Sequence, residues 1–137
     1  QGSDAGSIVQ VPIAGGYAKV ALELMAYRGV AAGIFAAATS TTQSGTATHP
    51  TPISLVSKAG SWVVSYWADK SNVATTSWTP PSEVVTRGTS FGSGSGALGT
   101  LSADSGSGLP TGPYGGLTAL ANVVSSSAIT WTVILQA

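Results

Sequence analysis

The feature that most constrains this chain is a period-two alternation of large apolar or β-branched residues along several short runs. The clearest runs are SWVVSYWA at residues 61–68, EVVTRGT at 83–89 and ITWTVILQ at 129–136. A period of two places successive side chains on opposite faces of an extended strand. Gly, Pro and Ser bound the runs, as they do at the ends of strands. We therefore expect an all-β fold with no helix longer than about two turns.

The run AKVALELMAYR at residues 18–28 permits two readings. Its Ala, Leu, Glu and Met residues are good helix formers. Its alternation between a glycine pair and Gly29 favours a strand instead. We predict a strand whose apolar face consists of Ala18, Val20, Leu22, Leu24 and Ala26, with Lys19, Glu23 and Tyr27 on the other face.

Weaker strands are expected from SIVQVP at residues 7–12, GIFAAATSTT at 33–42, GALGTLSAD at 96–104 and GLTALAN at 116–122. Pro50 and Pro52 keep the segment TATHPTP from forming a central strand. Many short strands separated by turn-rich loops are typical of an antiparallel β-sandwich or a jelly roll. We expect residues 1–137 to form a single sandwich domain, or the C-terminal part of a larger domain or polypeptide.

The run SWVVSYWADK contains two of the four tryptophans. On a strand, Trp62 and Tyr66 share a face without charged residues, which we assign to the core opposite Trp131. Trp67 lies on the other, mixed face, where we expect it to meet solvent or a partner. Asp69 begins a polar connection, and we expect its carboxylate to accept hydrogen bonds from a turn.

Six residues are the candidates for a binding site or an interface. Four are aromatic side chains that could contact a ligand or a neighbouring chain, and two are the adjacent charges after the aromatic cluster. They are Trp67, Trp78, Tyr27, Tyr114, Asp69 and Lys70.

The chain carries few charges, five basic and five acidic, so its formal net charge is zero. We therefore expect no electrostatic attraction for nucleic acid or an anionic membrane, and because no apolar run approaches the length of a membrane span, we expect no membrane insertion. Its polar surface must come from hydroxyls and backbone, because the sequence has 20 Ser, 16 Thr and 18 Gly residues. With no cysteine, it has neither disulfides nor thiolate metal sites. A weakly charged surface also opposes self-association little.

The sequence contains no convincing catalytic motif, and we predict that the protein is not an enzyme and uses no cofactor or metal. A serine triad would need His49, which is the only histidine, together with one of Asp4, Asp69 or Asp104. No G-x-S-x-G elbow accompanies it. The acidic residues, which also include Glu23 and Glu83, show no spacing typical of a glycosidase pair or a calcium loop.

The segments GSWVVSYWADKSNVATTSWTPPSEVVTRGTSFGSGSG, LSADSGSGLPTGPYGGLTA and SAITWTVIL resemble a recurring all-β domain. That domain is found in secreted multidomain proteins of actinobacteria and in tail or surface proteins of their phages. The similarity extends over about residues 4–135 and implies a non-catalytic sandwich module. Domains of this type have further strands before the segment that matches DAGSIVQVP, so this version is either trimmed or completed from elsewhere.

The leading functional hypothesis is a structural or adhesive module on the outside of a particle or cell, such as a phage tail or capsid-surface protein. The alternative is a secreted carbohydrate-binding module that stacks exposed aromatic rings on a surface glycan. We expect an extracellular or virion-surface location. We expect a homo-oligomer or lattice neighbour to contact residues 7–12 or 60–70, with Trp67 as an anchor. Gln1 is either a processed end or a boundary within a longer polypeptide.

Overall fold

The protein is all-β, as its alternating sequence predicts. A computed structural model describes residues 8, 10–14, 19–31 and 37–137, and these form ten strands and no helix. All the strand pairings are antiparallel. The strands are β1 (Ala37–Gln43), β2 (Thr46–Pro50), β3 (Ser54–Val56), β4 (Trp62–Ser71), β5 (Trp78–Thr79), β6 (Val85–Phe91), β7 (Ala97–Asp104), β8 (Gly112–Tyr114), β9 (Thr118–Ser125) and β10 (Ser127–Leu135).

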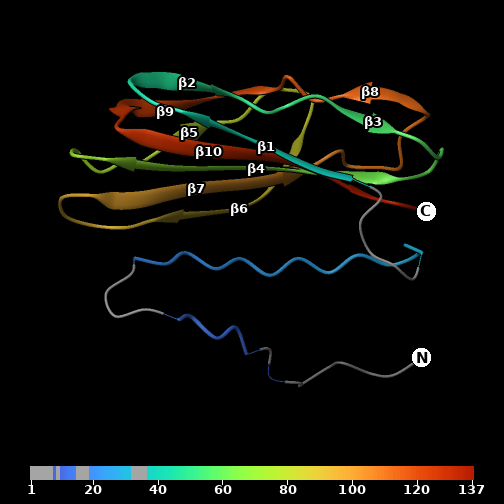
Figure 1. Ribbon diagram of the computed structural model, residues 1–137, viewed down its shortest axis with the longest axis horizontal. Helices are drawn as coiled ribbons and strands as arrows, with labels where there is room; N and C mark the ends of the chain where they lie inside the picture. The colour runs from blue at the N-terminus through green and yellow to red at the C-terminus, as the bar shows by residue number, and fades with distance from the viewer. Residues whose placement is uncertain (1–7, 9, 15–18, 32–36) are drawn as a thin grey trace.

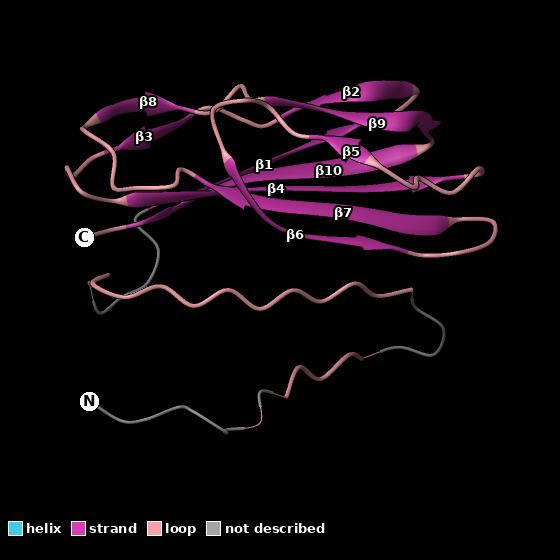
Figure 2. Cartoon of the chain, turned by 180° about the vertical axis from the view of Figure 1, so that it is seen from behind, coloured by secondary structure: helices cyan, strands magenta, loops and turns pink. Residues whose placement is uncertain are grey.

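The strands form one large sheet and two small ones. The five-stranded sheet has the order β1-β10-β4-β7-β6, the three-stranded sheet β2-β9-β5, and the two-stranded sheet β3-β8. Both small sheets lie on the same side of the five-stranded sheet (Figures 1 and 2). The segment with two prolines forms β2 at an edge of its sheet, in agreement with the expectation that it is not central.

Two apolar clusters fill the space between the large sheet and the small ones. The first cluster joins β4 and β7 to β5 and β9, and Trp67 is its largest residue. The second cluster joins Val63 and Ile134 of the large sheet to Val56 of β3, with Tyr114 of β8 packed against it. The five-stranded sheet therefore supplies one wall of both clusters.

The predicted faces of β4 and β10 are reversed in the structure. Trp67 is completely buried, and so is Val63 on the same face. Trp62, Tyr66 and Trp131 lie on the opposite face of the sheet and are only partly buried. The expectation that Trp67 meets solvent, and that Trp62 and Trp131 form the interior between the sheets, was therefore wrong.

The reversal has a physical cause, which is that hydroxyl groups are satisfied inside this protein. Thr130 and Thr132 of β10 are completely buried. Their hydroxyls donate to the carbonyl oxygens of Pro50 and Pro52 at 2.9 and 2.6 Å. Buried polar groups are tolerated when they are hydrogen-bonded. A face rich in Ser and Thr can thus be the inner face, although its sequence looks like a solvent-facing one.

Residues 19–28 run as an extended segment across the other face of the five-stranded sheet, and we call them the N-terminal arm (Figures 1 and 2). Burial alternates along the arm, with Glu23 and Tyr27 turned toward the sheet and Leu22 and Leu24 exposed. The arm belongs to no strand, so the predicted strand at 18–28 is wrong for its described residues, and its apolar face is not the buried one. Ala18 lies outside the described residues.

The first predicted strand, at residues 7–12, is also absent from the described part of that segment. Residues 8 and 10–12 are assigned to no strand, while Ser7 and Val9 lie outside the described residues. Ile8 and Val11 are exposed. Residues 10–14 run on the far side of the arm from the sheet (Figures 1 and 2).

Candidate functional site

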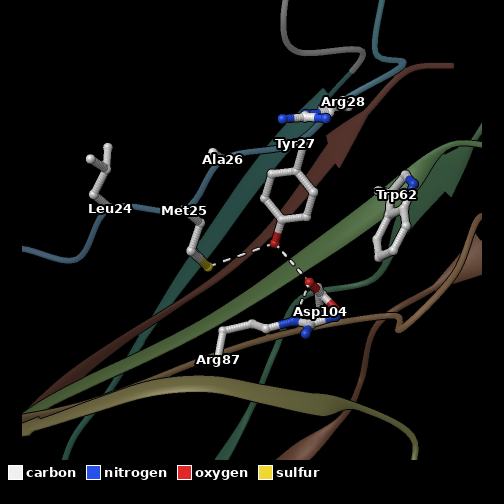
Figure 3. Close-up of a pocket in the computed structure, with 8 residues that line it drawn as sticks. All are labelled: Leu24, Met25, Ala26, Tyr27, Arg28, Trp62, Arg87 and Asp104. Atoms are coloured by element: carbon white, nitrogen blue, oxygen red, sulfur yellow. Dashed lines mark hydrogen bonds and ion pairs between the residues drawn. The ribbon is translucent and has the colours of Figure 1, made fainter. Parts of the chain in front are cut away.

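A densely bonded polar site lies where the N-terminal arm crosses the end of β7, and Asp104 is at its centre (Figure 3). The Tyr27 hydroxyl donates to Asp104 Oδ2 at 2.9 Å. Arg87 binds both carboxylate oxygens, through Nε at 2.7 Å and Nη2 at 2.9 Å. The backbone N–H of Gly106 donates to Oδ1 at 2.9 Å. Both oxygens of this buried carboxylate are therefore satisfied by donors from three parts of the chain.

Local backbone features place these groups. The register between β6 and β7 shifts between Thr86 and Gly88, which is a β-bulge that leaves Arg87 without an opposite partner. Bulges re-aim side chains near the edge of a sheet. Here the bulge directs Arg87 toward Asp104, and the turn after β7 brings in Gly106.

The charges of this site are set by its hydrogen bonds. Burial alone would raise the pKa of Asp104, but the bonds from Arg87, Gly106 and Tyr27 outweigh it and hold that pKa below its usual range. Burial and the neighbouring Asp104 carboxylate raise the pKa of Tyr27. At neutral pH the carboxylate is therefore ionised, and the phenol keeps its proton.

A cavity of about 490 Å³ opens beside these groups. The ring of Tyr27 packs against the ring of Trp62, with 5.7 Å between the ring centroids and 54° between the two ring planes. The lining residues are Leu24, Met25, Ala26, Tyr27, Arg28, Trp62, Arg87 and Asp104. Five of them belong to the arm, so the site fastens the arm to the large sheet.

A second polar cluster is buried between the sheets. His49 of β2 contacts Ser125 of β9, with Nε2 and Oγ 3.0 Å apart. The Ser125 hydroxyl also lies 2.7 Å from Asp69 Oδ2 on β4. Thr75 donates to the same oxygen at 2.6 Å, and Gln43 of β1 lies 3.0 Å from His49 Nδ1. Burial lowers the pKa of His49, and an ionised Asp69 opposes this effect.

The structure thus brings together a histidine, a serine and an aspartate, but in an order that differs from a serine triad. In a triad the histidine lies between the serine and the aspartate. Here Ser125 lies between His49 and Asp69. The exposed fractions of the three residues are 0%, 0% and 2%, so Ser125 is not open to a substrate. The geometry fits a structural link between the sheets.

The six predicted site residues are not gathered in one place. Trp67, Trp78 and Asp69 are buried between the sheets, where the rings of Trp78 and His49 meet in a T-shaped contact. Lys70 is exposed. Tyr27 lies on the opposite face of the large sheet, and Tyr114 packs against the second cluster.

Trp62 and Arg87 belong to the candidate site, but the sequence pattern does not identify them as site residues. It assigns Trp62 to the interior and indicates no role for Arg87. One signal could have suggested Arg87, because FGSGSG reads as a turn between two strands, and Arg87 and Asp104 lie on the two sides of that turn. The β-bulge that directs Arg87 toward Asp104 has no comparable signal in the sequence.

A comparison with protein-family models, with curated proteins and with solved structures found no match. Within the described ranges, no three His, Cys, Asp or Glu residues are grouped so that they could hold a metal ion. The same part of the chain has no helix long and apolar enough to span a membrane.

Proposed function

We propose that this chain is a non-catalytic structural module on the exterior of a particle, such as the tail or capsid surface of a phage virion, and that it associates with further copies of itself. The particle type comes from the sequence resemblance. The proposed self-association rests on one observation, which is that the outward face of the N-terminal arm is apolar and exposed.

The outward face of the arm is apolar and open. Val20, Leu22 and Leu24 are 53%, 65% and 75% exposed. Exposed apolar residues that occur singly are ordinary, whereas a contiguous row indicates a contact surface. Ile8, Val11 and Ile13 add further exposed apolar residues in the preceding segment. The arm therefore presents its most hydrophobic side away from its own sheet.

Among the described residues, the backbone of the arm is also unpaired. No backbone hydrogen bond joins residues 19–28 to another described residue, and the nearest one links Ala31 to Gln136. An extended segment with free N–H and C=O groups is a template for strand addition. The bonds of Glu23 to Thr100 and of Tyr27 to Asp104 hold the segment extended, so little ordering cost opposes pairing.

A second copy is the partner that we propose for this face. The outward row has no charge from Val20 to Ala26, and the chain has no net charge. Two copies therefore meet without electrostatic repulsion. This proposal moves the expected contact from residues 60–70, where Trp67 is buried, to the arm.

Sedimentation velocity at high micromolar concentration tests the association. We expect the wild-type protein to be oligomeric and the double variant Leu22→Ser, Leu24→Ser to be monomeric. Leu55→Ser is the matched control, because Leu55 is 63% exposed on β3 and away from the arm. A monomeric wild-type protein, or a double variant that associates as the control does, would contradict the proposal.

We further propose that the five-stranded sheet and the two small sheets pack face to face as a jelly-roll-like antiparallel sandwich. The two apolar clusters between the large sheet and the small ones support this arrangement. The carbohydrate-binding alternative has less support. Sugar stacking needs open and coplanar rings, whereas Trp67 and Trp78 are buried and Tyr27 is tilted against Trp62.

A further inference from the structure

The hydrogen-bond partners of His49 determine where its protons lie. Gln43 Nε2 donates to the carbonyl oxygen of Pro50 at 2.9 Å, and a carbonyl oxygen can only accept. This contact orients the Gln43 amide so that its Oε1 faces His49 Nδ1 at 3.0 Å. Because Oε1 is also only an acceptor, Nδ1 of His49 must carry a hydrogen.

On the other side of the ring, Ser125 makes two contacts that each need a hydrogen. If His49 is neutral and Asp69 is ionised, only one hydrogen is present for these two contacts. Ser125 Oγ is 3.0 Å from His49 Nε2 and 2.7 Å from Asp69 Oδ2. A hydroxyl has one hydrogen, so Ser125 can donate to the ring or to the carboxylate but not to both. The remaining contact would bring two lone pairs together in a buried site, at a high cost in free energy.

We infer that His49, Ser125 and Asp69 hold one additional shared proton, so that the buried cluster is electrically neutral. In one arrangement His49 is an imidazolium that donates to Ser125, and Ser125 donates to the Asp69 carboxylate. In the other, a protonated Asp69 donates to Ser125, and Ser125 donates to a neutral ring. Each arrangement satisfies every contact around Ser125.

The state of the second carboxylate oxygen favours the second arrangement. Asp69 Oδ1 is buried and has no hydrogen-bond partner among the described residues. An unpartnered oxygen costs less in a neutral carboxyl group than in an ionised one. Gly99 of β7 lies against this oxygen and has no side chain to donate a bond.

No other described charge compensates the cluster from the elements packed around it. The side chains that face it are Gln43 from β1, Trp78 from β5 and Thr75 from the loop between β4 and β5, and none of them is charged. Lys70 follows Asp69 on β4 but is exposed, on the opposite face of the strand. The shared proton therefore has to neutralise the buried charge itself.

The shared proton makes the link between the sheets sensitive to alkaline pH. In the unfolded chain His and Asp titrate near their ordinary pKa values of about 6.5 and 3.9. Above about pH 6.5 the folded cluster keeps a proton that the unfolded chain has released, so the unfolding equilibrium constant rises about tenfold per pH unit. Between about pH 4 and 6.5 both states hold one proton, and the cluster adds no pH dependence.

Proton uptake during folding tests the inference on the wild-type protein. Calorimetric unfolding at pH 8 in buffers with different ionisation enthalpies should show the release of about one proton per chain on unfolding. Nitrogen NMR of His49, the only histidine, should show a hydrogen on Nδ1. Release of no proton, or a neutral ring that carries its hydrogen on Nε2, would overturn the inference.

The variant Asp69→Asn imitates the neutral cluster. Its amide can donate to Ser125, and Ser125 can then donate to His49, so no shared proton is needed. We expect the rise of the unfolding constant above about pH 6.5 to disappear in this variant. Glu83→Gln, at an exposed carboxylate, is the matched control and should keep the wild-type slope. Equal slopes in all three proteins would overturn the inference, and the proton count decides the question if Asp69→Asn does not fold.

Discussion

The Tyr27 hydroxyl donates to the carboxylate of Asp104 at 2.9 Å, and this bond joins residues 77 positions apart in the chain. It fastens the N-terminal arm to β7, beside the tilted ring contact between Tyr27 and Trp62. The orientation of the arm, and with it the exposure of Leu22 and Leu24, therefore depends on a few side-chain contacts.

Tyr27→Phe should loosen the arm without unfolding the sheets. The change removes one hydrogen bond to an ionised group, which is worth about 1.5–3 kcal/mol when formed, and keeps the ring on Trp62. We expect faster proteolysis within residues 19–28, with unchanged cleavage elsewhere. Equal cleavage rates for the two proteins would show that the bond does not hold the arm.

Asp104→Asn should destabilise the protein at neutral pH, by about 2 kcal/mol, because it weakens the bonds to Arg87, Gly106 and Tyr27. The pKa of Asp104 is lowered in the folded state, so its contribution is fully present above about pH 4 and is lost as the pH falls further. Urea unfolding of both proteins at pH 7 and at pH 2.5 checks this. A difference as large in acid as at neutral pH would argue against the ionised pair.

Trp67→Ala should be the most damaging aromatic truncation. Trp67 is completely buried, and truncation of a core tryptophan costs about 3–5 kcal/mol. Its Nε1 also donates to the carbonyl oxygen of His49 at 2.8 Å. Trp62→Ala, on the partly covered face, should cost clearly less. Urea midpoints in the reverse order would show that the faces of β4 are the other way round.

Gly99→Ala should destabilise β7 by about 1–3 kcal/mol through overpacking. An added Cβ would lie 2.6 Å from Asp69 Oδ1 and 2.9 Å from Thr75 Cβ, both parts of the buried cluster. Ala97→Gly in the same strand is a comparison for general backbone effects and should cost about 0.5–1 kcal/mol. Thermal unfolding of both variants measures the difference.

The strands were predictable from the sequence because alternation and turn residues are local signals. The runs at residues 61–68 and 129–136 fall within or beside β4 and β10, and the all-β class is confirmed. The burial of each face was not predictable from polarity. Thr130 and Thr132 are buried because acceptors from distant prolines satisfy them, and no local pattern encodes those partners.

The candidate sites were only partly predictable for the same reason. Tyr27 and Asp69 were identified as polar or aromatic candidates, but their partners come from strands that are distant in the sequence. Arg87 depends on a bulge that shifts the register of β6. The exposed apolar row of the arm was visible as a pattern, yet its natural interpretation was a buried face.

The pairing of β1 with β10 has a mechanical consequence. The two strands are antiparallel, so Ala37 at the start of β1 lies opposite Ile134 near the end of β10. A force applied through the chain on both sides of these strands enters at one end of the ladder. It would peel the strands apart one hydrogen bond at a time, whereas a shearing load would strain all the bonds together. We therefore expect these two strands to separate at low pulling force, starting from the end of the ladder where Ala37 lies opposite Ile134.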